Sequence, residues 1–281
     1  MSHLAVTGYA SLDYALALSG QIAGDRTTLI DHRDASDWPR VGGCPAYLAM
    51  AAARQGMKAS PVSWIGADHL GRIYLDSLTK AGVGTEGVER LDEPKSPMSV
   101  LAYQADGSCA CLFDPAFTGR EELTDKQRDV IAAASHLCVS VGPPQILEPV
   151  LACRTADARL YWVLKNDAHA FPDALARRLS AEADVIFCSR SEHPMIGATA
   201  KGAVIVETRG AGEIRIEAGT KRAVLQVEPV SVHDTTGAGD SFAGGFIAAE
   251  MAGETDPEAA ARAGAEAART MLQERSEREK P

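Results

Sequence analysis

The segment VHDTTGAGDSFAGGF, residues 232–246, carries the strongest structural signal in this chain. Residues 238–250 have a composition that suits a helix, so residues 236–240 are expected at its N-terminus. Backbone N–H groups in a first turn lack intrahelical partners and the helix dipole favours negative charge, so this turn can bind an anion. The same field favours an ionised Asp240, which suits that carboxylate to accept a proton from an attacking hydroxyl.

Other classes of glycine-rich turn fit this segment less well. A P-loop requires a lysine after its last glycine, and a dinucleotide fingerprint requires a third glycine where Phe242 stands. Gly239-Asp240-Ser241 could be the nucleophile block of a GDS-type serine hydrolase, but that block usually precedes its histidine, and the last histidine here is His233. The simplest alternative is a helix N-cap whose glycines serve only tight packing.

Composition limits the class of protein. The 281 residues carry a formal net charge of −10, and 46% of them are hydrophobic, without an apolar run long enough to span a bilayer. We therefore expect one large globular domain, or a domain plus a small appendage, and no membrane association. The acidic charge argues against nucleic-acid binding, and the N-terminus lacks a secretory pattern, which predicts a cytoplasmic protein. Cys109 and Cys111 are expected to be buried packing thiols, because no zinc-ligand spacing surrounds them.

Short β-like runs alternate with helical segments along most of the chain. Buried strands are expected at residues 3–8, 61–65, 136–141, 158–164, 184–188 and 203–206. Helices are expected at residues 45–55, 68–81, 124–134 and 171–181, with a last helix beginning near Asp256-Pro257. Thr124 followed by Gln127 is the pattern of a capping box. This alternation favours a mostly parallel sheet covered on both faces.

Two segments depart from that alternation. Residues 14–31 and 97–113 alternate apolar and polar side chains, and the second folds back around residues 105–108 as a hairpin. We expect them to form a small sheet outside the main one. Such a sheet could be an edge extension, a dimer contact or a lid over a site, and the pattern does not decide between these uses.

Several further motifs occur in the order found in one family. DTTGAGD at 234–240 resembles the C-terminal signature of the ribokinase (PfkB) family of carbohydrate and nucleoside kinases, and GGCPAYLAMAAARQG at 42–56 resembles its N-terminal signature. Similar blocks are GYASLD at 8–13, IGADHLG at 65–71, KAGV at 80–83 and VETRG at 206–210. The resemblance runs over essentially the whole chain.

The resemblance implies a Rossmann-like, three-layer α/β fold in a single domain, residues 1–281, with a small β lid inserted at about 14–40 and 94–113. It implies ATP-dependent phosphorylation of a primary hydroxyl on a sugar, nucleoside or similar molecule, with Asp240 as catalytic base. The anion hole would be formed by Gly237, Ala238 and Gly239. The acceptor would be bound by Asp13, Gly42, Gly43 and Tyr47, and a homodimer could form through the lid.

The same resemblance assigns nucleotide and cation sites. Nucleotide-binding positions are Ser189, Thr208, Gly210, Gly237 and Gly239. Glu192 would hold Mg²⁺ through water, and a monovalent cation such as K⁺ would lie beside Asp234.

Two departures from the family pattern bear on activity. Tyr47 stands where an asparagine is usual, and Ser189 stands where the magnesium motif has asparagine. These changes motivate a second alternative, a non-catalytic sugar- or nucleotide-binding member, although the retained Asp240 argues against it. Lys165 could supply positive charge to a phosphate, but a solvated lysine at a strand end is the more common role.

Overall fold

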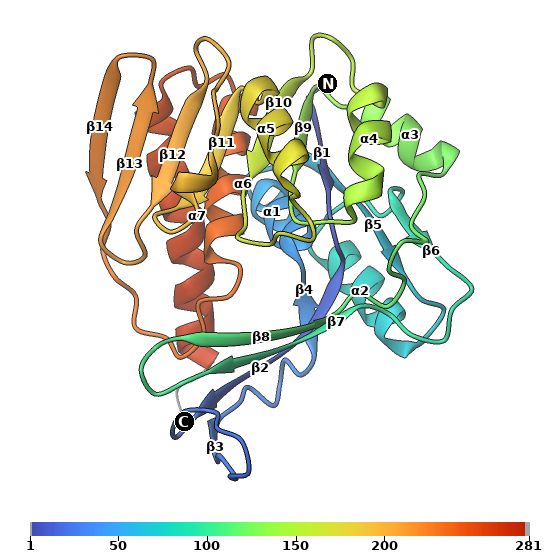
Figure 1. The fold of residues 1–281 in the computed structure, drawn as a ribbon, viewed down its shortest axis with the longest axis vertical. Coiled ribbons are helices and arrows are strands. Elements are labelled where there is room, and N and C mark those ends of the chain that lie inside the picture. Colours follow the sequence, from blue (N-terminus) through green and yellow to red (C-terminus); the bar gives the residue numbers. More distant parts are fainter. Residues whose placement is uncertain (1, 279–281) are drawn as a thin grey trace.

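The computed structural model describes residues 2–278 and arranges their strands in two sheets (Figure 1). The strands of the larger sheet are β1 (His3–Thr7), β5 (Lys58–Ile65), β6 (Val88–Arg90), β9 (His136–Val139), β10 (Arg159–Val163), β11 (Val185–Ser189), β12 (Val204–Thr208), β13 (Glu213–Ala218) and β14 (Lys221–Gln226). Their order is β14-β13-β12-β11-β10-β9-β1-β5-β6. Neighbours from β6 to β12 are parallel, and β13 and β14 close one edge as an antiparallel hairpin.

Helices cover both faces of the larger sheet. They are α1 (Cys44–Arg54), α2 (His69–Lys80), α3 (Asp125–Ala132), α4 (Leu147–Cys153), α5 (Asp173–Glu182), α6 (Ala238–Met251) and α7 (Pro257–Arg278), with 3₁₀ turns η1 (Pro144–Ile146) and η2 (His193–Met195). Successive strand residues point to opposite faces, so on β1 Leu4 and Val6 enter one core and Ala5 enters the other. The first core packs against α1, α2, α6 and α7, and the second against α3, α4 and α5.

The predicted α/β fold class with a mostly parallel, three-layer arrangement is confirmed. Each of the six predicted strands overlaps a strand of the larger sheet, and the predicted helices correspond to α1, α2, α3, α5, α6 and α7. The capping box is present, since the Thr124 amide donates to Gln127 Oε1 at 3.0 Å and the Gln127 amide donates back to the Thr124 hydroxyl. Helix α4 and the β13–β14 hairpin were not predicted from the sequence.

The smaller sheet lies apart from the larger one, across the bottom of the view in Figure 1. Its strands are β2 (Ser11–Leu18), β3 (Ile30–His32), β4 (Arg40–Gly42), β7 (Met98–Tyr103) and β8 (Cys109–Asp114). The predicted hairpin is the β7–β8 pair, which turns through residues 104–108. The prediction that Cys109 and Cys111 are buried is wrong. Both are exposed on β8, which is an edge strand of the smaller sheet.

The order of the parallel strands reverses direction at β1 in the larger sheet. β1 lies between β5 and β9, so the chain winds in one direction through β5 and β6 and in the other through β9 to β12. In open α/β sheets, ligands bind outside the carboxyl ends of the strands near such a reversal.

None of the helices within residues 2–278 is long and apolar enough to cross a bilayer.

Candidate active site

The turn before α6 has the conformation that its glycines predict. Gly237 is the N-cap of α6 with φ of 80°, a left-handed conformation that favours glycine. A Cβ on Gly237 would lie 2.6 Å from ring atoms of Tyr47, so the tyrosine ring packs directly against the turn. The prediction that residues 236–240 form a helix N-terminus is confirmed. The Ala238 amide donates to the Thr235 carbonyl at 3.1 Å, which closes the turn.

Asp240 lies in the first turn of α6 and is only 5% exposed. Lys165, just beyond the end of β10, places its Nζ atom 3.5 Å from Asp240 Oδ1. The Asp240 carboxylate raises the pKa of the Lys165 ammonium. Lys165 does lie just past a strand end with its side chain 36% exposed, and its pairing with the carboxylate predicted to act as the base was not anticipated. Asp240 Oδ1 is buried, and within the described chain it makes no hydrogen bond in addition to its ion pair with Lys165.

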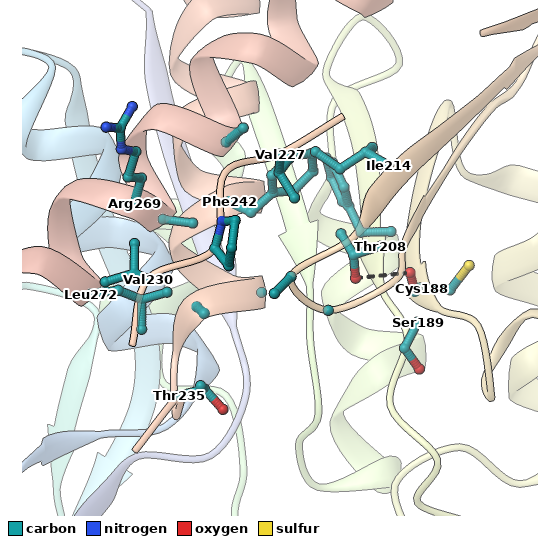
Figure 2. A pocket seen from close by; sticks show the side chains of 18 of the residues that line it. Cys188, Ser189, Thr208, Ile214, Val227, Val230, Thr235, Phe242, Arg269 and Leu272 are labelled. Atoms are coloured by element: carbon teal, nitrogen blue, oxygen red, sulfur yellow. Dashed lines mark hydrogen bonds between the residues drawn. The ribbon is translucent and has the colours of Figure 1, made fainter. Parts of the chain in front are cut away.

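A cavity of about 420 Å³ opens beside this turn at the carboxyl ends of β10, β11 and β12 (Figure 2). Four of the five residues predicted to bind nucleotide line it, namely Ser189, Thr208, Gly210 and Gly239. Gly237, the fifth, belongs to the same turn but is not among the lining residues. Much of the remaining lining is apolar and was not anticipated. It includes Ile214, Val227, Val230, Phe242 and Leu272.

Glu192 also lines this cavity and accepts hydrogen bonds from main-chain amides at the end of β11 and just beyond β10. Its Oε2 atom accepts a hydrogen bond from the Ser189 amide at 2.6 Å, and its Oε1 atom accepts one from the Asn166 amide at 3.3 Å. Ser189 itself bonds to the Ser191 hydroxyl at 3.0 Å. The carboxylate is thus held toward the cavity by main-chain donors, with lone pairs left for a further partner.

Asp13, on β2, is 3% exposed and faces the turn from the smaller sheet. Its carboxylate accepts hydrogen bonds from the Ser11 hydroxyl at 2.7 Å and from the Tyr47 hydroxyl at 3.4 Å. A Cβ on Gly42 would lie 2.2 Å from this carboxylate, so only glycine permits the strand to approach so closely. Burial raises the pKa of Asp13, although the hydrogen bond from Ser11 and the charge of Arg40 act in the opposite direction.

Tyr47 connects these two parts of the site. Its ring lies against Gly237, its hydroxyl reaches Asp13, and the same hydroxyl accepts a hydrogen bond from Arg40 Nε at 2.9 Å. The side chain is 7% exposed, and its pKa is raised by burial. Tyr47 is therefore placed between the predicted acceptor-binding acid and the predicted anion hole.

Asp234 lies behind the turn between two guanidinium groups. Its Oδ2 atom is paired with Arg40 Nη2, and its Oδ1 atom is 3.4 Å from Arg275 Nη1. Burial acts to raise the pKa of Asp234, but the charges of Arg40 and Arg275 and hydrogen bonds from Thr236 hold it below its ordinary value. The two arginines were not anticipated from the sequence.

Comparison with known proteins identifies the class of this site. The family model for pfkB family carbohydrate kinases matches residues 1–281. The chain belongs to the pfkB family of carbohydrate kinases. It is accordingly a phosphotransferase with an alcohol group as acceptor, in the class of sugar and nucleoside kinases. The serine hydrolase alternative is not favoured, and Ser241 is a buried residue inside the first turn of α6.

Individual relatives share about a quarter of the aligned residues with this chain. Ribokinase of Bacillus subtilis is 25% identical to this pfkB-family chain over 284 residues, which cover 93% of the chain and 90% of that protein. The ATP-dependent ribose-1-phosphate kinase of Halopiger xanaduensis is 26% identical, covering 74% of this chain and 72% of its own length. Ribokinase of Cryptococcus neoformans in complex with ADP has the same fold, with a TM-score of 0.77, 20% identity and coverage of 98% and 100%.

Proposed function

We propose that this pfkB-family enzyme transfers the γ-phosphoryl group of ATP to a primary hydroxyl of a sugar or nucleoside, with Asp240 as the base. The observation that carries the proposal is the position of the Asp240 carboxylate. It lies in the first turn of α6, beside the cavity-lining Gly239 and within 3.5 Å of the Lys165 ammonium. A hydroxyl deprotonated there would attack a phosphoryl group held by the same turn.

ATP is assigned to the cavity because its two walls differ in polarity. The apolar wall formed by Ile214, Val227 and Leu272 suits a planar base, and the polar wall near Lys165 and the turn suits phosphates. A solved structure with this fold holds ADP, which supports the same nucleotide class here. The amides of the Gly237–Gly239 turn would then contact the charge that develops on the transferring group.

Magnesium fits the carboxylate present in the cavity. Residues 2–278 contain no group of three or more His, Cys, Asp or Glu side chains placed to hold a metal ion. Mg²⁺ usually keeps several waters and is bound by nucleotide phosphates with one or two carboxylates. Here Glu192 would bond to a metal-bound water. When bound, the ion neutralises phosphate charge.

The smaller sheet is proposed to act as a lid. Its strand β7 already reaches the turn, where the Tyr103 hydroxyl and the Thr236 hydroxyl are 2.6 Å apart. Closure over the acceptor would exclude water from Asp240. The sheet also exposes Leu29, Ile30, Leu112 and Phe113, and the homodimer through this sheet stays a prediction.

A screen for acceptor-dependent ADP release tests the proposal. The purified chain would be incubated with MgATP and a panel of pentoses, hexoses, amino-sugar conjugates and ribonucleosides. At least one acceptor should raise ADP release well above the acceptor-free rate. ADP release that no acceptor raises would contradict the kinase assignment, and ester hydrolysis without ATP would restore the hydrolase alternative.

The raised pKa of Asp13 predicts how acceptor binding depends on pH. An ionised Asp13 can accept hydrogen bonds from two hydroxyls, whereas its protonated form accepts fewer. Because burial raises this pKa, protonation begins at a higher pH than for an ordinary aspartate. As the pH falls through the raised pKa, the acceptor KM should increase by up to about tenfold per pH unit.

The control for this pH effect is Asp13→Asn, which removes the titrating group at nearly constant size. Its acceptor KM should be high at every pH and independent of pH, while the ATP KM stays close to that of the wild type. If the acceptor KM and the ATP KM changed together with pH, the assignment of Asp13 to the acceptor would be overturned.

A further inference from the structure

Arg275 is a buried cation fixed behind the anion-hole turn. It lies near the end of α7 and is 4% exposed. Its Nη1 atom donates to the Asp234 carbonyl at 2.8 Å and to the Thr236 carbonyl at 2.9 Å, and it is 3.4 Å from Asp234 Oδ1. Three oxygen atoms from residues 234–236 therefore converge on a single nitrogen.

Such a set of oxygens is of the kind that binds an alkali ion. Main-chain carbonyl oxygens, with a carboxylate beside them, can replace the hydration shell of K⁺. Here the point that the three oxygens share is already occupied by Arg275 Nη1, and the other carboxylate oxygen of Asp234 is paired with Arg40. The residues present therefore do not fit the monovalent cation that the family resemblance implied beside Asp234.

The charges around Asp234 are balanced without an added ion. Asp13 and Asp234 contribute two carboxylates, and Arg40 and Arg275 contribute two guanidiniums, all of them buried. An additional cation would bring an uncompensated charge into a site shielded from water, which is energetically unfavourable. An arginine carried by the chain needs no cation from solution.

We propose that the Arg275 guanidinium takes the place of a monovalent cation in this enzyme and positions the anion-hole turn, so that neither folding nor catalysis requires K⁺ or Na⁺. Arg275 touches the carbonyl of Thr236, and Gly237 follows directly in the chain. The guanidinium is thus a positioning group that acts through the main chain of residues 234–237. It does not contact the reacting atoms.

The first test compares salts of equal ionic strength on the unmodified protein. Melting temperature and turnover should be the same, within error, in KCl, NaCl and tetramethylammonium chloride. The activity measurement rests on the proposed kinase function, whereas the melting measurement does not, so a failure of one proposal can be told from a failure of the other. A saturable increase in melting temperature or turnover that is specific to K⁺ would overturn the inference.

The second test removes the guanidinium. Arg275→Ala leaves three oxygens facing a space, and the melting temperature in tetramethylammonium chloride should fall by roughly 10 °C because a buried ion pair loses one partner. KCl should restore part of the melting temperature and part of the turnover. Arg275→Lys keeps a positive charge at this position, so its melting temperature and turnover should depend on K⁺ less than those of the alanine variant. This second variant keeps the test informative if Arg275→Ala does not fold.

The matched control is Arg278→Ala, three residues further along α7. Arg278 is half-exposed and pairs with Asp34 and Asp37 instead of the turn. This variant should show no K⁺-specific gain in melting temperature. If KCl also gave no specific increase in melting temperature in either Arg275→Ala or Arg275→Lys, Arg275 would not occupy the position of a cation.

Discussion

Asp240→Asn should reduce turnover by about 10²–10⁴-fold while leaving ATP binding nearly unchanged, the range expected when a positioned general base is lost. The substitution keeps the shape of the side chain and removes its ability to accept a proton. Steady-state kinetics with the acceptor found by screening, together with an ATP-binding isotherm for the variant, would measure both quantities.

Asp125→Asn provides the matched control for this prediction. Asp125 is an exposed carboxylate in the first turn of α3, a helix on the opposite face of the larger sheet. It shares the helix-terminal position of Asp240 without any contact with the site, so its turnover should equal that of the wild type. An Asp240→Asn enzyme with turnover within about twofold of wild type would remove Asp240 from the role of base.

Gly237→Ala should abolish most of the activity by displacing the turn that we propose as the anion hole. The new Cβ would lie 2.6 Å from the Tyr47 ring, and the left-handed conformation of this residue is unfavourable for alanine. Either the turn or Tyr47 must shift, which would move the amides away from the position proposed for the transferring phosphoryl group. Removal of one such donor costs about 10²–10³-fold in turnover, and we expect a loss of that size.

Gly253→Ala separates backbone strain from displacement of the site. Gly253 also has a positive φ, of 103°, but a Cβ there would meet no atom within 4 Å. Both variants should lose on the order of 1–2 kcal/mol of stability from backbone strain, Gly237→Ala should lose more through its contact with Tyr47, and only Gly237→Ala should lose turnover. Equal turnover in the two variants would show that the Gly237 turn does not hold the phosphoryl group.

The local parts of the site could be predicted from the sequence because their geometry depends on neighbouring residues. A helix N-terminus, its glycine N-cap and the carboxylate three positions later are determined within residues 237–240, and the structure has each of them. The strand-helix alternation likewise depends on local patterning. It predicted a mostly parallel sheet covered by helices on both faces.

The charged partners could not be predicted because they come from elements far apart in the chain. Lys165 meets Asp240 from the end of β10, and Arg275 meets Asp234 from the end of α7. No spacing rule connects such pairs, and a lone lysine or arginine is most often solvated. The apolar wall of the cavity was missed for the same reason, since Ile214, Val227 and Leu272 come from three separate segments.

For Tyr47 the predicted contact with the acceptor stays a prediction, and the structure adds contacts within the chain that the sequence did not indicate. The sequence predicted a direct contact between its side chain and the acceptor. In the structure its hydroxyl is engaged by Asp13 and Arg40 and its ring is covered by Gly237. We therefore expect Tyr47 to influence acceptor binding mainly by orienting Asp13.

Phosphorus NMR of the reaction products tests the central claim most directly. The enzyme would be incubated with MgATP and the acceptor that the screen identifies, and the products of wild type and Asp240→Asn would be compared. The account predicts a phosphomonoester on a primary hydroxyl of the acceptor, formed in equal amount with ADP by the wild type and nearly absent with the variant. Inorganic phosphate as the only new phosphorus species, or equal phosphomonoester from both proteins, would contradict it.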